Sequence, residues 1–280
     1  MTKFLILTSA ASSNALSAAG GQSGGTDYTV LFSIIGLLVC IALPTAVILL
    51  AILKYEGSFK QILWGILGFV VFSTILNFLV SSIFFFDYLD QEATSFQASL
   101  LIIIRVICEV LGMFLLLKWT KKRKGLGNAL NFGIGYCLPE CLYVGFLLAG
   151  YLIISTSEGI DSIDLLRELR VFIQDSNLVA GQEWRFILRG FTVLVFGGLQ
   201  ISSAVVVFIS VQTKKYWLAG IAVIFGLLIR LPNRLHSFDA WFWGNYAVIL
   251  PYLAVMTVII CVTVYILWKN NKTEMQKSNK

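Results

Sequence analysis

Seven long apolar segments constrain this chain more than any other feature. They cover residues 29–53, 61–86, 99–118, 126–155, 187–212, 217–232 and 245–268, and the whole chain is 58% hydrophobic and only 13% charged. A helix that spans a bilayer needs about 20 apolar residues, and in lipid only helices and closed barrels satisfy their backbone groups. The sequence therefore predicts an all-α polytopic membrane protein, a seven-helix transmembrane bundle. The sixth segment is short, so we expect a tilted half-helix that ends at Pro232.

Basic residues gather in one of the two sets of loops that connect these segments. Thirteen Lys and Arg residues lie in the loops at 54–60, 118–124, 214–215 and 269–280, and five lie in the opposite set. Loops rich in Lys and Arg stay on the cytoplasmic side, so we expect the N-terminus outside and the C-terminus inside. The net charge of +6 then follows from membrane orientation, and we expect the lipid bilayer, but no nucleic acid, as a partner.

This pattern divides the chain into three expected regions. Residues 1–28 are expected to form a flexible extracytoplasmic tail, although Lys3 followed by a short apolar run also fits a cleaved signal peptide. Residues 29–268 make up the seven-span membrane domain, whose outer loop 156–186 is predicted to carry an amphipathic helix on the membrane surface. Residues 269–280 are expected to form a basic cytoplasmic tail.

Four charged residues are predicted to lie deep inside the spans: Arg105 and Glu109 in the third, Glu140 in the fourth and Arg230 in the sixth. With a rise of about 1.5 Å per residue, all four lie about 9–15 Å below the outer face. Charges at this depth are costly, so they should face the bundle interior and pair. We expect Arg105 to neutralise Glu109 within its own helix and Arg230 to neutralise Glu140. Two interpretations stay open: an ion-pair network that locks the helices together, or a hydrophilic cavity that handles a substrate.

The fourth span contains the most distinctive stretch, residues 131–145. Gly133, Gly135 and Gly145 would let neighbouring helices approach closely. Pro139 removes one helical hydrogen bond and predicts a kink just before Glu140.

Residues 133–140 read Gly-Ile-Gly-Tyr-Cys-Leu-Pro-Glu, which resembles the Gly-x-Gly-His-Gly-x-x-Glu pattern of the YhfC family of intramembrane metalloproteases. Both early glycines and the glutamate match, and Tyr136 replaces the histidine. This family is grouped with the CPBP/CAAX-type proteases, PrsW and the non-catalytic Aph subunit of gamma-secretase. The resemblance extends from about Leu31 to Trp268, and its seven-span layout with an outer N-terminus is similar to that of Aph.

Other motifs of the resembling family are only partly present. Of a Glu-Glu-x-x-Arg pattern in the third span, this chain keeps the first glutamate, Glu109. Gly197 or Gly198 stands where the fifth span has a histidine, and the sixth-span pattern His-x-x-x-Asp aligns with Gly226 and Arg230. The resemblance therefore implies that most metal-holding residues are missing, and we expect no bound metal and no cofactor.

The sequence thus predicts an intramembrane-protease-like protein of the bacterial cell membrane that is catalytically degenerate and binds a membrane protein or peptide partner as a scaffold. One alternative is an active membrane-embedded endopeptidase, in which Glu109 and Glu140 serve as general base and electrostatic stabiliser and zinc is possible. A second alternative is a small-solute transporter with the charged residues as its binding site.

Overall fold

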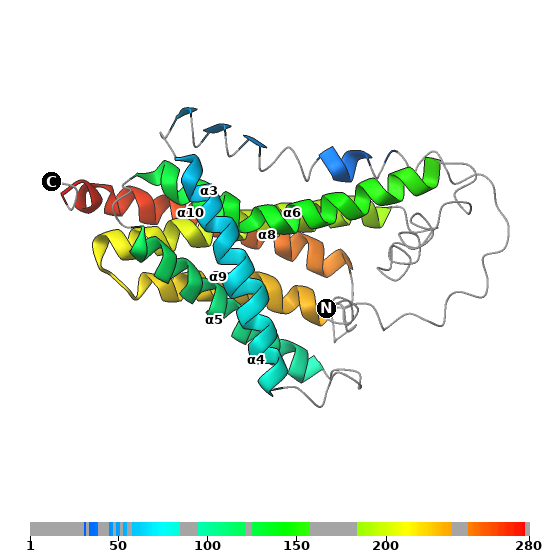
Figure 1. The fold of residues 1–280 in the computed structure, drawn as a ribbon, viewed down its shortest axis with the longest axis horizontal. Coiled ribbons are helices and arrows are strands. Elements are labelled where there is room, and N and C mark those ends of the chain that lie inside the picture. Colours follow the sequence, from blue (N-terminus) through cyan, green and yellow to red (C-terminus); the bar gives the residue numbers. More distant parts are fainter. Residues whose placement is uncertain are drawn as a thin grey trace. The chain divides into compact units, whose positions relative to one another are not determined.

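The computed structural model describes residues 58–84, 95–120, 125–156, 184–236 and 246–277, with short helical pieces between 31 and 54. These residues form helices and, within the described ranges, no strand (Figure 1). The longer helices are α3 (Phe59–Gly68), the π-helix η2 (Phe69–Leu76), α4 (Asn77–Phe84), α5 (Ser95–Trp119), α6 (Leu126–Thr156), α8 (Trp184–Thr213), α9 (Leu218–His236) and α10 (Tyr246–Lys277). The predicted tail 1–28 and most of the predicted outer loop, residues 157–183, lie outside the described residues.

The prediction of an all-α membrane protein is confirmed. Six of the seven apolar segments match continuous helical stretches to within a few residues, except that α10 continues nine residues beyond its segment. Four helices in the described part are long and apolar enough to cross a bilayer, namely Phe59–Val80, Ser99–Trp119, Gly190–Thr213 and Val248–Lys272. The count of seven spans and the orientation of the N-terminus stay predictions.

The predicted end of the sixth helix at Pro232 is wrong, because α9 continues to His236. Proline has no N–H, so the carbonyl of Leu228, one turn earlier, loses its helical donor. The hydroxyl of Tyr252 in α10 donates to that carbonyl at 2.8 Å. A neighbouring helix therefore replaces the missing hydrogen bond, which is how membrane helices tolerate internal proline.

The chain divides into two compact units. One unit contains Met1–Leu43 and Glu140–Leu194, and the other contains Pro44–Pro139 and Val195–Lys280. The boundary in α6 falls directly after Pro139, the residue at which the sequence predicted a kink. The second unit contains most of the described helices and is the one considered below.

Within this second unit, α6 is in backbone contact with two helices through glycines. A methyl group on Gly65 of α3 would lie 2.7 Å from the backbone nitrogen of Tyr136, and one on Gly133 would lie 2.7 Å from the Cα of Ile201 in α8. Gly135 meets the backbone of Ile62 in the same way. The predicted close approach is confirmed at Gly133 and Gly135. At Gly145, in the other unit, the nearest described neighbour of such a methyl group would be the side chain of Leu37 at 3.8 Å, so a close approach there stays a prediction.

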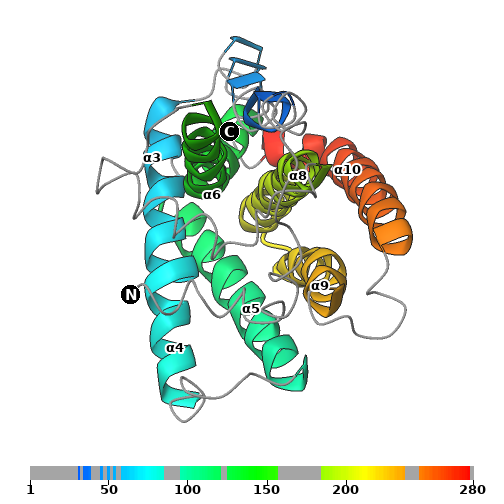
Figure 2. The ribbon, with the colours of Figure 1, turned by 90° about the vertical axis from the view of Figure 1, so that its right-hand side faces the viewer.

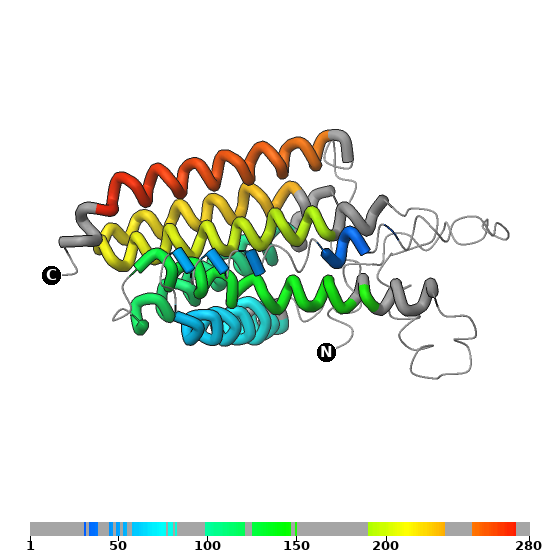
Figure 3. The backbone as a smooth tube through the Cα atoms, turned by 90° about the horizontal axis from the view of Figure 1, so that it is seen from above, coloured from blue at the N-terminus to red at the C-terminus, as the bar shows by residue number. Residues whose placement is uncertain are grey.

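Helix α5 is central in the second unit, between the continuous α3–η2–α4 helix on one side and α9 on the other (Figure 2). Gly112 of α5 makes room for Phe72 of η2, and Gly226 of α9 makes room for Val106 of α5. Helix α10 runs alongside α9 (Figure 3). Because α5 and α9 pack so closely, polar side chains that face each other across this interface are removed from lipid.

Candidate functional site

A buried carboxylate, Glu109 in the middle of α5, is the centre of the candidate site. Its side chain is 6% exposed. The Oε1 atom accepts three hydrogen bonds, from Ser73 Oγ at 2.7 Å, Arg105 Nε at 2.9 Å and Arg230 Nη1 at 2.7 Å. The Oε2 atom also lies 2.7 Å from Arg230 Nη1. Charge-assisted bonds of this length are the strong kind, so the carboxylate is held in one position.

The two guanidinium groups reach Glu109 in different ways. Arg105 lies one turn earlier on the same face of α5, and its side chain remains 36% exposed. Arg230 comes from α9, is only 8% exposed, and has its guanidinium carbon 5.8 Å from the ring centre of Phe196. A guanidinium over an aromatic face gains cation–π attraction, which helps to compensate its removal from water.

Ser73 is a site residue that the sequence reading missed. It is buried within the π-helix η2, and its hydroxyl also accepts a hydrogen bond from Arg105 Nη2 at 3.3 Å. A π-helix is rare and often found at functional sites. The available signal was weak, because Ser73 is one of several small polar residues in its span, together with Thr74, Ser81 and Ser82. A serine in a helix can also bond its own backbone without any part in a site.

A small cavity adjoins this cluster. It has a volume of about 10 Å³ and is lined by Glu109 and Arg230, by Gln200 and Ser203 of α8, and by apolar residues. This volume is close to the smallest that holds one water molecule, about 10–15 Å³. Gln200 and Ser203 are both buried. They are three residues apart in an apolar span, and this helical spacing of polar residues is the sequence signal that could have revealed them.

Tyr136 of α6 lies near the cluster, at the position where the resembling family has a histidine. Its side chain is fully buried, with its ring against Phe69 at a centroid distance of 5.8 Å and against Phe132 at 6.2 Å. Phe69 begins η2, the helix that also contains Ser73. Among the described residues its hydroxyl has no hydrogen-bond partner.

The predicted partner of Arg230 needs correction. The depth calculation assigned this guanidinium to Glu140, whereas its carboxylate partner in the structure is Glu109. Depth along the membrane normal does not say which helices are neighbours, and the contact of Gly226 with Val106 brings α9 directly onto α5. The expected pair of Arg105 with Glu109 is present. Glu140 is half-buried and belongs to the other compact unit.

These features define a helical membrane protein with a carboxylate and two guanidinium groups clustered in its interior. The chain belongs to the YhfC intramembrane metalloprotease family, whose model matches residues 39–249. Neither the curated proteins nor the solved structures contain a significant match to it.

A divalent metal ion does not fit the residues around Glu109, although the family name implies one. A catalytic zinc site usually has three protein ligands, and no three His, Cys, Asp or Glu side chains come together in the part of the chain that the structure describes. Both oxygens of Glu109 already face the Arg230 guanidinium at 2.7 Å. A cation on this carboxylate would be repelled by the guanidinium, so metal and Arg230 exclude each other.

Proposed function

We propose that this protein is a catalytically degenerate member of the YhfC family that binds a membrane protein or peptide as a scaffold in the bacterial cell membrane. One observation carries the proposal. Glu109, the glutamate of the third span that matches the family pattern, forms a buried ion pair with Arg230. A general base needs an oxygen that can take a proton from water. Here Oε1 already accepts three hydrogen bonds and Oε2 faces a guanidinium, so proton transfer to either oxygen is disfavoured.

An active endopeptidase that uses Glu109 and Glu140 is the second candidate. The observation in its favour is the cavity beside Glu109, because it has room for about one water molecule. A water molecule at this place would meet the carboxylate and the Arg230 guanidinium together. The same guanidinium already binds the carboxylate that would have to take the proton, and for that reason we favour the degenerate function.

The test begins with partner capture from native membranes. The full-length chain is cross-linked briefly, purified, and analysed by mass spectrometry for co-purifying chains and their termini. The matched variant combines Glu109→Gln with Arg230→Met, which removes both charges of the buried pair together. We expect the same partner, uncleaved and in equal amount, with the wild type and the double variant. An unrelated polytopic membrane protein, purified identically, identifies chains that bind non-specifically.

Three results would contradict the proposal. The first is a partner that is cleaved beside the wild type and intact beside the double variant, since Glu109 would then be needed for hydrolysis. The second is stoichiometric zinc in chelator-washed protein, because Arg230 and a metal cannot share Glu109. The third is the absence of any chain that is enriched over the control, which would remove the scaffold function.

A further inference from the structure

An apolar groove on the surface of the second unit lies between the α3–η2 helix and α5, away from the charged cluster. It has a volume of about 370 Å³ and is lined by Trp64, Leu67, Val71, Phe72, Leu115, Leu116 and Trp119. Ligand sites usually have volumes of about 300–1,000 Å³, so the groove is large enough to bind more than a solvent molecule. Both of its walls are helices with the length and composition of membrane spans, and its lining residues Leu67, Leu115 and Trp119 are exposed.

Two glycines give the groove its depth. A methyl group on Gly68 would lie 2.8 Å from the side chain of Leu116, and Gly112 leaves the space that the ring of Phe72 fills. The two helices therefore approach each other closely at these glycines. At one end the rings of Trp64 and Trp119 come within 5.7 Å of each other. Tryptophan at the end of a membrane helix marks the level of the lipid headgroups.

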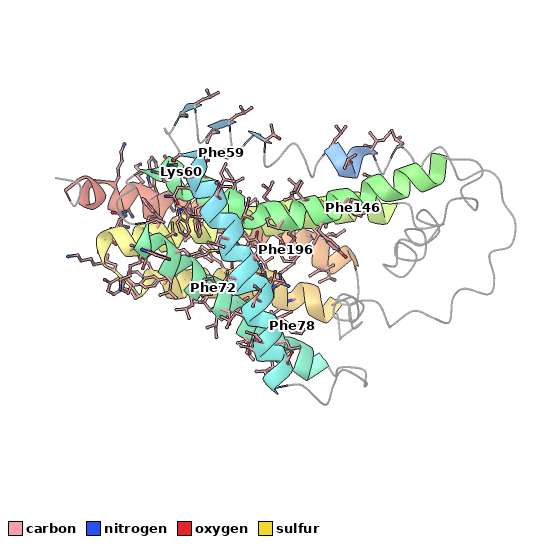
Figure 4. All side chains as sticks on the ribbon, viewed as in Figure 1. Phe59, Lys60, Phe72, Phe78, Phe146 and Phe196 are labelled. Atoms are coloured by element: carbon pink, nitrogen blue, oxygen red, sulfur yellow. The ribbon has the colours of Figure 1, made fainter. Side chains whose placement is uncertain are left out.

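A lysine stands at this same end. Lys60 precedes Trp64 by four residues, so both lie on one face of α3, and Lys60 is exposed. Figure 4 shows Phe59 and Lys60 at the start of α3 and Phe72 further along the same continuous helix. The lysine of the opposite wall, Lys118, lies instead over the ring of Phe114, at 5.9 Å from its centre. Of these two lysines, Lys60 is thus the one aligned with the groove in the described part of the chain.

We propose that this groove binds one acyl chain of an anionic phospholipid, with the Lys60 ammonium group against the headgroup phosphate. The apolar lining matches the chain, the tryptophan pair matches the interfacial region, and the lysine complements the negative headgroup. A lysine side chain can extend along apolar surface while its charge stays at the level of the headgroups. The site is separate from the Glu109 cluster and does not depend on whether the protein is an enzyme.

Tryptophan quenching by brominated phospholipids tests the proposal. The full chain is reconstituted into phosphatidylcholine nanodiscs, and brominated phosphatidylglycerol or brominated phosphatidylcholine is titrated in. The quenching that belongs to the groove is the part of the fluorescence quenching that is lost when Trp64 and Trp119 are replaced by phenylalanine. We expect the anionic lipid to quench this signal at an about fivefold lower mole fraction, which corresponds to one lysine near a headgroup. Lys60→Gln should abolish the preference, and Lys60→Arg should preserve it.

Lys118→Gln is the matched control, because it removes a neighbouring charge at the same end of the membrane without changing the groove. It should keep the fivefold preference. Equal quenching by the two lipids in the wild type would overturn the proposal, as would a preference that Lys118→Gln lowers as much as Lys60→Gln. Quenching of the groove tryptophans by neither lipid would also overturn it, because another occupant would then cover the groove.

Discussion

Replacing Arg230 with methionine should leave the carboxylate of Glu109 buried with reduced compensation. Breaking a buried ion pair by removing one partner costs about 3–5 kcal/mol. Glu109 would keep its bonds from Ser73 and Arg105, so we expect a loss of about 3 kcal/mol, at the lower end of that range. Glu109→Gln should cost as much or more, because Arg230 is only 8% exposed and would lose the carboxylate with which it pairs. The double substitution should cost about 1 kcal/mol or less, because neither charge remains.

Thermal unfolding in mild detergent measures these differences. Cys137 is 1% exposed, whereas Cys261 is exposed in the folded protein, so the other cysteines are first replaced by serine. In that background the Cys137 thiol becomes reactive when the helices separate, and a fluorescent maleimide reports unfolding. A protein of this size loses about 2–4 °C in Tm for each kcal/mol, which gives about 6–12 °C for Arg230→Met. Arg105→Met is the control, since its side chain is 36% exposed and such a pair contributes about 1 kcal/mol or less.

The pattern of the two single variants and the double variant decides the outcome. If both single changes lower Tm and the double variant recovers most of the loss, the two side chains interact as the distances indicate. If the single changes are harmless, or the double variant shows the sum of their effects, the buried pair does not exist in the membrane protein. Glu109 would then be available for proton transfer, and the endopeptidase function would become the better one.

Three further predictions concern other parts of the chain. Tyr136→Phe should leave Tm unchanged or raise it, because the buried hydroxyl that it removes has no hydrogen-bond partner among the described residues. Burying such a hydroxyl without a partner costs about 1–3 kcal/mol. A lower Tm in this variant would reveal a partner. Gly135→Ala should prevent stable folding, because the added methyl group meets the backbone of Ile62. Gly220→Ala, where such a methyl group has no described residue within 4 Å, should be neutral or stabilising in the same assay. Cysteine placed near Lys122 should resist a label added from outside and cysteine near Ser162 should react; the reverse would refute the predicted orientation.

Most of the helices were predictable, because in a membrane the length of an apolar segment nearly determines the element. The segment 99–118, for example, matches α5 to within a few residues. The exception is the end of α9, which was predicted at Pro232 but lies at His236 because another helix supplies a hydrogen bond. The hydroxyl of Tyr252 satisfies the carbonyl that proline leaves without a donor, and no local pattern shows that this residue lies nearby.

The candidate site was only partly predictable. Charged residues inside spans are conspicuous, so Arg105, Glu109 and Arg230 could be identified from the sequence alone. The partner of Arg230, in contrast, depends on which helix lies beside α9. Small residues such as Gly226 determine this through close contacts that the sequence does not show. Ser73 was missed because several hydroxyl residues share its helix and such a residue can bond its own backbone, as Ser82 does with the carbonyl of Phe78 at 2.8 Å.

The pairing also gives a reason for a glutamate at position 109 that does not depend on hydrolysis. Once a guanidinium occupies position 230, loss of the carboxylate alone would leave a buried cation without its ionic partner, which costs about 3–5 kcal/mol. Stability by itself is therefore a sufficient reason for a glutamate at this position. It follows that Glu109, taken alone, does not favour an active peptidase over a scaffold. What distinguishes the two is whether the carboxylate has an oxygen available for water, and Arg230 controls that availability.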